Sequence, residues 1–305
     1  MNPKYISYTI LTMMVIFSSC KKDANIISNN TAPYYSEIST LLLENYVNRI
    51  YIDLIGREPL DTEMDSDVQY LRDADVTLES RDSLIYKLQF DTTYIEGDSS
   101  YKFAYFHRMY DMLKVRLLEG ASNSYIGQDL YNHYQNYLVD SIAGNILEAN
   151  KKMLNYNVLN NVLKSELQYY NGQIEINEMH RRMIYNSVYD NINMNTFNFI
   201  NAAFDNLLFR YPTQYEFDEV YLMIEDNTAQ VVLGASGNNK EAFTHIICDT
   251  REFYEGVIVW AYGTLLARIP TSEETDFLIQ SFYYDYDFQW VQRQIMQSDE
   301  YAHFN

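Results

Sequence analysis

Apolar residues recur at helical spacing along most of the chain from residue 36 onward. Three stretches show the pattern most clearly: Leu43, Val47, Ile50 and Leu54; Phe197, Ile200, Phe204, Leu207 and Leu208; and Phe253, Val257, Trp260, Ala261 and Leu265. Intervals of three and four residues place an apolar stripe along one face of a helix. Long runs rich in Val and Thr, which indicate strands, are absent from the sequence. The pattern predicts an all-α, multi-helix body of about twelve helices.

One ten-residue pattern, Leu-[Ile/Leu]-x-Arg-x-Pro-x-x-x-Glu, occurs three times. Its shared positions are Arg57, Pro59 and Glu63, then Arg210, Pro212 and Glu216, and then Arg268, Pro270 and Glu274. Every proline after Pro33 lies in this motif. The similarity continues upstream, with apolar or aromatic residues ten and six positions before each arginine: Val47 and Tyr51, Ile200 and Phe204, and Ile258 and Tyr262.

The motif has the features of a helix end followed by the start of the next helix. A residue before proline avoids the α conformation, so we expect a helix to end near each arginine, whose side chain can bond the last helical carbonyls. Thr213 and Thr271 stand three residues before the motif glutamate, which is a capping box for the next helix. Leu60 replaces the threonine in the first copy, so we expect Asp61 or Thr62 to cap there. We interpret all nine shared residues as structural members of three related helix–RxP–helix junctions.

A second signature, apolar-x-x-[Asp/Thr/Ser]-x-x-aromatic, follows each arginine by about thirty residues. Its copies are Leu88, Asp91 and Tyr94; Ile247, Thr250 and Phe253; and Ile295, Ser298 and Tyr301. We interpret it as a further helix junction, with Asp249, Thr250 or Ser298 as candidate N-caps. The body then consists of repeat-like units near residues 43–95, 197–253 and 254–304, with a helical insert over 100–195. Helices are expected in the insert near 128–147 and 155–170, with turns at Gly120 and at Asn171-Gly172.

The motif set resembles helical domains of unknown function that stand beside cytochrome-like modules in planctomycete proteins. It is also similar to repeats in bacterial surface proteins with the phrase LLGRxPxxxE…ILxSxEY. Ile55-Gly56-Arg57-Glu58-Pro59 and Ser298-Asp299-Glu300-Tyr301 carry this resemblance, which covers residues 45–110 and 200–304. The sequence has no Cys-x-x-Cys-His motif for haem attachment, so a cytochrome role does not transfer.

The N-terminus indicates export. Lys4 precedes an apolar run from Ile10 to Phe17, and the following Ser18-Ser19-Cys20 resembles a bacterial lipobox. The resemblance implies a signal peptide over 1–19, acylation of Cys20, a flexible tether to residue 35 and a body over 36–305. The alternative is an ordinary secretory signal with a chance cysteine.

The Cys-Lys-Lys-Asp start of the expected mature chain resembles outer-membrane lipoproteins of the Bacteroidota. We therefore expect a lipid-anchored outer-membrane protein, with the cell surface favoured over the periplasmic face. A single acid, Asp23, follows the lysines before Ala24, so the leaflet stays open. The formal net charge of −20 argues against nucleic acid as a partner. Cys248 would have no intrachain partner after acylation of Cys20.

Patterns that carry chemistry are few. The five histidines include no His-Glu-x-x-His motif, and the ten glycines form no phosphate-binding loop. Cys248 follows two isoleucines, which favours an inert buried thiol over a nucleophile. We expect no catalytic residue, no metal site and no cofactor.

Tyrosine clusters at residues 34–35, 169–170 and 283–290 are the remaining feature. In the last cluster Tyr283, Tyr284, Tyr286, Phe288 and Trp290 are candidates for an interface, although a chain with 30 Tyr can also use them in its core. The favoured function is a non-enzymatic accessory or scaffold lipoprotein of an outer-membrane complex for secretion, assembly or uptake, with outer-membrane proteins as partners. The alternative is a surface glycan-binding module or a glycan-degrading enzyme.

Overall fold

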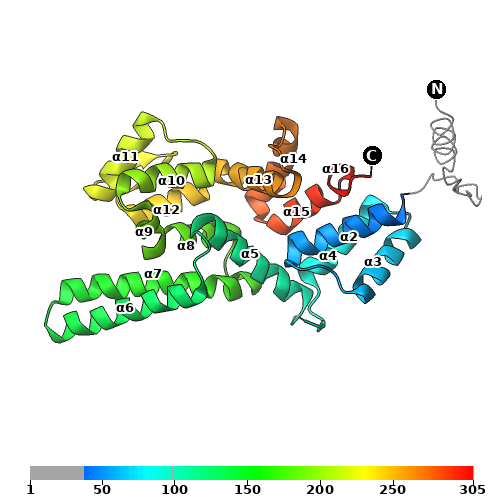
Figure 1. Ribbon diagram of the computed structural model, residues 1–305. Helices are drawn as coiled ribbons and strands as arrows, with labels where there is room; N and C mark the ends of the chain where they lie inside the picture. The colour runs from blue at the N-terminus through cyan, green and yellow to red at the C-terminus, as the bar shows by residue number, and fades with distance from the viewer. Residues whose placement is uncertain (1–37, 98, 305) are drawn as a thin grey trace, which may run out of the picture. The chain divides into compact units, whose positions relative to one another are not determined.

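The structure, a computed structural model, describes residues 38–97 and 99–304 (Figure 1). The predicted signal peptide over 1–19, Cys20 and the tether to residue 35 lie outside these residues. The all-α prediction is confirmed: the described part holds fifteen helices and one short two-stranded hairpin. The number exceeds the expected twelve partly because short helices, such as the four-residue α16 (Asp299–Ala302), leave little periodicity in a sequence.

Four helices open the described part of the chain: α2 (Thr40–Ile55), α3 (Asp61–Asp73), α4 (Leu78–Phe90) and α5 (Tyr101–Leu117). Helix α2 packs against the other three. The stripe predicted from Leu43 to Leu54 is its buried face, and none of the four residues exposes more than 1% of its surface. Burial of this stripe, rather than helix propensity, holds α2 in place.

The next helices form a long hairpin, α6 (Asn123–Ile142) and α7 (Ile146–Tyr170), followed by α8 (Ile176–Ile184) and α9 (Ser187–Asn193). The sequence suggested one helix over 128–147, but the chain turns at Gly144, whose φ is 78°. This is the left-handed conformation that glycine adopts readily, so the glycine allows α7 to return along α6. The expected turn at Asn171-Gly172 is confirmed.

The last part of the body contains eight more elements before α16. They are α10 (Thr196–Leu208), α11 (Gln214–Glu225), β1 (Gln230–Val232), β2 (Ala235–Gly237), α12 (Lys240–Asp249), α13 (Arg251–Leu266), α14 (Ser272–Asp285) and α15 (Phe288–Met296); β1 and β2 pair antiparallel. Helix α13 packs directly on the backbone of α10, since a Cβ on Gly256 would lie 2.0 Å from the Leu207 carbonyl oxygen.

The first and last helices of the body lie together (Figure 1). The Tyr46 hydroxyl of α2 donates to the Met296 carbonyl at 3.1 Å, and the buried Tyr301 of α16 donates to Asp53 at 2.7 Å. These bonds join residues about 250 positions apart in the sequence. The C-terminal helices therefore complete the core that α2 begins.

Candidate functional site

The first junction links α2 to α3 through an arginine that reaches forward to the next helix. Gly56, which follows the end of α2, has a left-handed φ of 77°. Both Nη atoms of Arg57 donate to the Glu63 carboxylate, at 2.7 and 2.9 Å. The same carboxylate accepts the backbone N–H of Leu60 at 2.8 Å. The contacts tie the end of one helix to the first turn of the next.

The other two junctions have the same geometry. Each arginine makes two hydrogen bonds of 2.6–2.8 Å to the glutamate six residues later, in the pairs Arg210–Glu216 and Arg268–Glu274. The residue before each of these arginines is left-handed, as Gly56 is, and the two residues are Phe209 and Ala267. Each of these two arginines also pairs with a second carboxylate. Glu252, in the first turn of α13, pairs with Arg210, and Glu300, in α16, pairs with Arg268. The prediction of three related helix–RxP–helix junctions is therefore confirmed.

An aromatic ring lies beneath each guanidinium. The ring belongs to the residue six positions before the arginine, and the distances from Cζ to the centroids of Tyr51, Phe204 and Tyr262 are 5.7, 5.2 and 5.0 Å. Cation–π attraction at these distances explains why the sequence similarity extends upstream of the motif.

Two details of the junction prediction are corrected. The arginines pair with the glutamate of the next helix, whereas the sequence suggested that they cap the carbonyls of the preceding one. In the first junction neither Asp61 nor Thr62 is the N-cap. Leu60 occupies that position without a side-chain acceptor, and its N–H is satisfied by Glu63 instead.

The three glutamates are held in their ionised form. Burial raises the pKa of Glu63, but hydrogen bonds from Arg57, the Leu60 N–H and the Tyr101 hydroxyl outweigh it and lower the pKa to about 2. Hydrogen bonds from the paired arginine are the first cause at Glu216 and Glu274, and each pKa falls to about 2. Because these side chains are engaged with one another, the junctions act as structural clamps.

The second signature marks true helix starts in two of its three copies. Thr250 accepts the N–H of Phe253 at the start of α13, and Ser298 accepts that of Tyr301 at the start of α16. The first copy marks only the end of a helix. Asp91 is the C-cap of α4, Tyr94 is 81% exposed and begins no helix, and the N-cap of α5 is Ser100, nine residues after Asp91. The loop between them displaces the start.

The aromatic cluster at residues 283–290 divides between core and surface. Phe288 is 1% exposed and stacks on Trp260, so it belongs to the core rather than to an interface. Tyr284 is exposed, Tyr283 and Trp290 are half-buried, and Tyr286 is exposed at the edge of a cleft.

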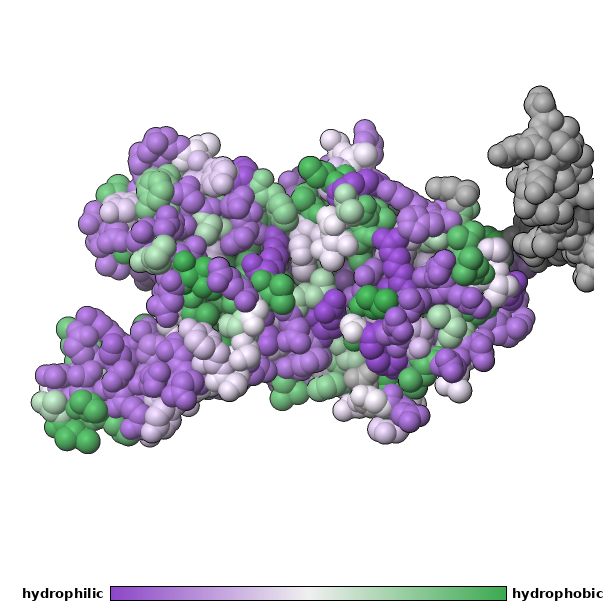
Figure 2. Space-filling model, in the orientation of Figure 1, coloured by the Kyte–Doolittle hydropathy of each residue, from purple (hydrophilic) through white to green (hydrophobic). Residues whose placement is uncertain are grey.

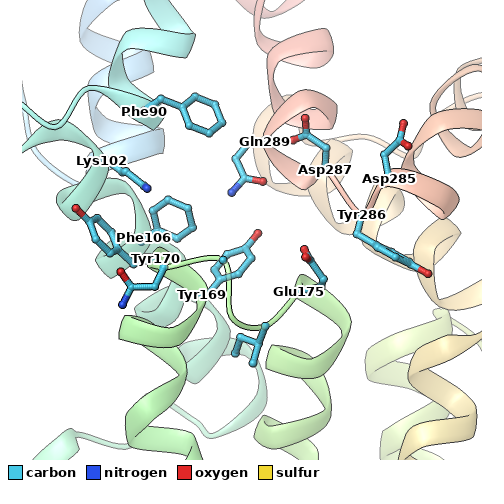
Figure 3. A pocket seen from close by; sticks show the side chains of 13 residues that line it. Phe90, Lys102, Phe106, Tyr169, Tyr170, Glu175, Asp285, Tyr286, Asp287 and Gln289 are labelled. Carbon is cyan, nitrogen blue, oxygen red and sulfur yellow. The ribbon is translucent and has the colours of Figure 1, made fainter.

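This cleft, with a volume of about 440 Å³, lies where α5, the end of α7 and the loop before α15 meet (Figure 3). Its aromatic wall consists of Phe90, Phe106, Tyr169 and Tyr170. Its polar groups are Lys102, Glu175, Asp285, Asp287 and Gln289. In Figure 3 Tyr169 and Glu175 direct their oxygens toward the middle of the cleft, whereas Asp285 and Tyr286 point away from it.

Two groups of the cleft have unused bonding capacity. Tyr169 is 5% exposed, and its buried hydroxyl makes no hydrogen bond of normal geometry; the Gln289 amide beside it makes only a weak contact with it. Burial and the nearby Asp287 raise the pKa of Glu175. Asp287 itself accepts the Trp290 N–H and lies 3.8 Å from Arg293. A buried polar group without a partner is uncommon in a folded protein and calls for an explanation.

Sequence reasoning found only part of this cleft. The pair Tyr169-Tyr170 and Tyr286 were noted as members of aromatic clusters, but Lys102 and Glu175 were not identified. Each lies within two residues of a helix start, in segments without a motif. No spacing in the sequence brings residues 102, 175 and 287 together.

Two further reactive side chains, Cys248 and His180, are buried. Cys248 is 1% exposed and burial raises the pKa of its thiol, as the sequence indicated. Burial, with the nearby Arg116, lowers the pKa of His180 to about 3, so this imidazole is neutral at physiological pH. Among the residues that the structure describes, no group of three His, Cys, Asp or Glu side chains is placed to hold a metal ion.

No protein-family model, curated protein or solved structure matches this chain.

Proposed function

We propose that this chain is a non-enzymatic accessory protein of an outer-membrane complex, anchored by lipid at Cys20 and displayed at the cell surface. The lipobox-like sequence at residues 17–20 supports the anchor. No helix in the described part of the chain is long and apolar enough to cross a bilayer. Two acyl chains on one cysteine are enough to attach a protein stably to a membrane without a membrane-spanning helix.

The observation that carries the docking function is the free end of the α6–α7 hairpin. Four aliphatic side chains around its turn are exposed: Val139, Ile142, Ile146 and Leu147, with 64, 88, 60 and 70% of their surface accessible. Figure 2 shows the hydrophobic patch they form at the end of the hairpin. The buried residues of α6, Ile126 and Leu130, lie near its start. The far half of α6 therefore has no fully buried residue.

The chemistry of this patch indicates its partner. Glu148 and Lys151 pair with each other at 2.8 Å, so their charges offset one another beside the apolar residues. A neutral apolar helical tip fits an apolar groove on a protein, in the helix-in-groove mode. Covering the four side chains would contribute about 6 kcal/mol before the cost of association. The partner we propose is an outer-membrane protein of a secretion, assembly or uptake machine.

We also propose that the three junction segments are copies of one repeated helical unit, with the hairpin and its neighbours as the insert over 100–195. The shared arginine, glutamate and aromatic contacts support this. Helix α13 would close the second copy and open the third.

Co-purification in mild detergent tests the docking function. The double variant Ile142→Asp, Leu147→Asp should lose its co-purifying protein. The matched variant Val115→Asp, Ile269→Asp changes two equally exposed apolar residues elsewhere and should retain it. Equal recovery from both variants would contradict the proposal. So would binding of the Cys20→Ala protein to protein-free lipid vesicles through the same patch.

Location is tested separately. The Cys20→Ala protein should leave the membrane fraction, and protease added to intact cells should degrade the wild type. Retention of the Cys20→Ala protein in the membrane would refute the lipid anchor, and protection from protease would place the protein on the periplasmic face.

Glycan binding is the second candidate, and the cleft in Figure 3 favours it. Aromatic rings beside carboxylates and an amide are the groups that bind sugars. Calorimetry with neutral and amino-substituted oligosaccharides measures this activity independently of the hairpin.

A further inference from the structure

The docking function leaves the cleft of Figure 3 unused, and one of its walls is strongly acidic. Glu175 stands at the start of α8, and Asp285 and Asp287 lie at the junction of α14 and α15. Lys102 is the one cation among the residues that line the cleft, on the opposite wall. Its Nζ lies 4.5 Å from the centroid of the Tyr170 ring, so the aromatic wall already holds a positive charge.

We propose that the acidic side of this cleft binds a primary ammonium group, as carried by a lysine side chain or an amino sugar. Glu175 and Asp287 supply negative charge, and the Tyr169 hydroxyl supplies a further acceptor beneath them. The ammonium donates to Glu175 and, once the Gln289 side chain turns aside, to the Tyr169 oxygen. This inference does not rest on docking by the hairpin.

Charge favours an ammonium over a neutral or anionic ligand. Asp285 points away from the cleft, but Glu175 and Asp287 still outnumber the single ammonium of Lys102, so a bound cation offsets repulsion that already exists between these two carboxylates. Asp287 is partly engaged by Arg293 and by the N–H of Trp290, which leaves Glu175 as the principal anionic partner. An ammonium has three N–H donors and no acceptor, which matches a site whose available oxygens are acceptors.

The buried hydroxyl of Tyr169, which makes no hydrogen bond of normal geometry, is the second, independent indication. Its ring packs edge-to-face on Phe106 at 4.9 Å between centroids, so the side chain is fixed with its oxygen toward the acidic wall. Leaving this oxygen without a partner costs stability in the empty protein. A ligand that supplies an N–H removes that cost.

The test uses the purified full chain in mild detergent and isothermal titration calorimetry. Nα-acetyl-lysine methylamide and glucosamine are the ammonium probes. Nα-acetyl-norleucine methylamide and methyl glucoside are their uncharged counterparts. We expect each ammonium probe to bind at least tenfold more tightly than its counterpart. The tighter of the two ammonium probes identifies the natural source as a protein lysine or an amino sugar.

Three variants within the cleft and one control outside it assign the binding to these residues. Glu175→Gln should weaken ammonium binding at least tenfold, while Glu58→Gln, which removes an exposed carboxylate outside the cleft, should leave it unchanged. Tyr169→Phe should weaken binding several-fold without lowering the urea midpoint, because the hydroxyl it removes has no partner. Lys102→Met should leave ammonium binding unchanged or tighten it.

Four results would overturn the inference. They are absence of heat with both ammonium probes, equal affinity for charged and uncharged probes, full affinity in Glu175→Gln, and loss of affinity in Lys102→Met. The last would show that the cleft holds an anion at the lysine. A lower urea midpoint for Tyr169→Phe would show that its hydroxyl is already bonded within the protein.

Discussion

Replacement of Glu63 by glutamine should weaken the hydrogen bonds of the first junction while preserving the shape of the side chain. The carboxylate accepts two hydrogen bonds from Arg57, one from the Leu60 N–H and one from the Tyr101 hydroxyl, at 2.7–2.9 Å. Glutamine offers one acceptor oxygen and adds two N–H donors that face these donors. At least one buried or half-buried donor is therefore left without a partner.

The expected loss follows from the pKa of Glu63. Its fall from 4.5 to about 2 corresponds to about 3 kcal/mol of stability at neutral pH. Solvent screening reduces this, so we expect Glu63→Gln to lower the free energy of unfolding by about 2 kcal/mol. Loss of hydrogen bonds to a charged group predicts a similar value, about 1.5–3 kcal/mol.

The pH dependence makes the prediction specific. A carboxyl whose pKa is depressed on folding stabilises the protein above pH 4.5, and this contribution is lost as the pH falls toward 2. Urea unfolding followed by circular dichroism should show the full difference between wild type and Glu63→Gln at pH 7. The difference should be smaller at pH 3, because at that pH Glu63 is protonated in the unfolded chain but still largely ionised in the folded protein, so folding must release a proton.

Glu58→Gln is the matched control, since it removes an exposed carboxylate in the same turn and should change stability by less than about 0.5 kcal/mol. A difference between wild type and Glu63→Gln that stays constant from pH 7 to pH 3 would refute the ionic explanation. Equal stability of the two proteins at pH 7 would refute the clamp itself.

Three further predictions concern α13, the junction after it and the thiol. Gly256→Ala places a methyl group against the backbone of α10 and should destabilise the protein by about 3 kcal/mol, whereas Gly263→Ala on the same helix meets open space and should stabilise it by up to about 1 kcal/mol in urea unfolding. Ala267→Gly relieves a left-handed alanine and should raise the free energy of unfolding by about 1 kcal/mol; a decrease would show that the conformation carries no strain. Cys248 should resist thiol reagents in the native protein and react on unfolding, and rapid native labelling would disprove its burial.

Much of the fold could be predicted because its signals are local. A stripe such as Leu43 to Leu54 reports a helix and its buried face at once, since both follow from one period of 3.6 residues. The Arg-x-Pro motif located three helix ends for the same reason, because proline restricts the residue before it regardless of the rest of the chain. Tyr94 was misassigned where a loop of variable length separated two local signals.

The sequence by itself determined that this chain is helical, where its three junctions lie and which arginines and glutamates build them. Tertiary structure alone decided that Arg210 and Arg268 each bind a second carboxylate, since Glu252 and Glu300 lie 42 and 32 residues further along the chain at the starts of other helices. Tertiary structure also determined where the cleft lies, because it brings Lys102 and Glu175 next to the loop before α15. Such contacts depend on how helices that are distant in the sequence pack together, and the periodicity of a single helix does not show which other helix its buried face contacts.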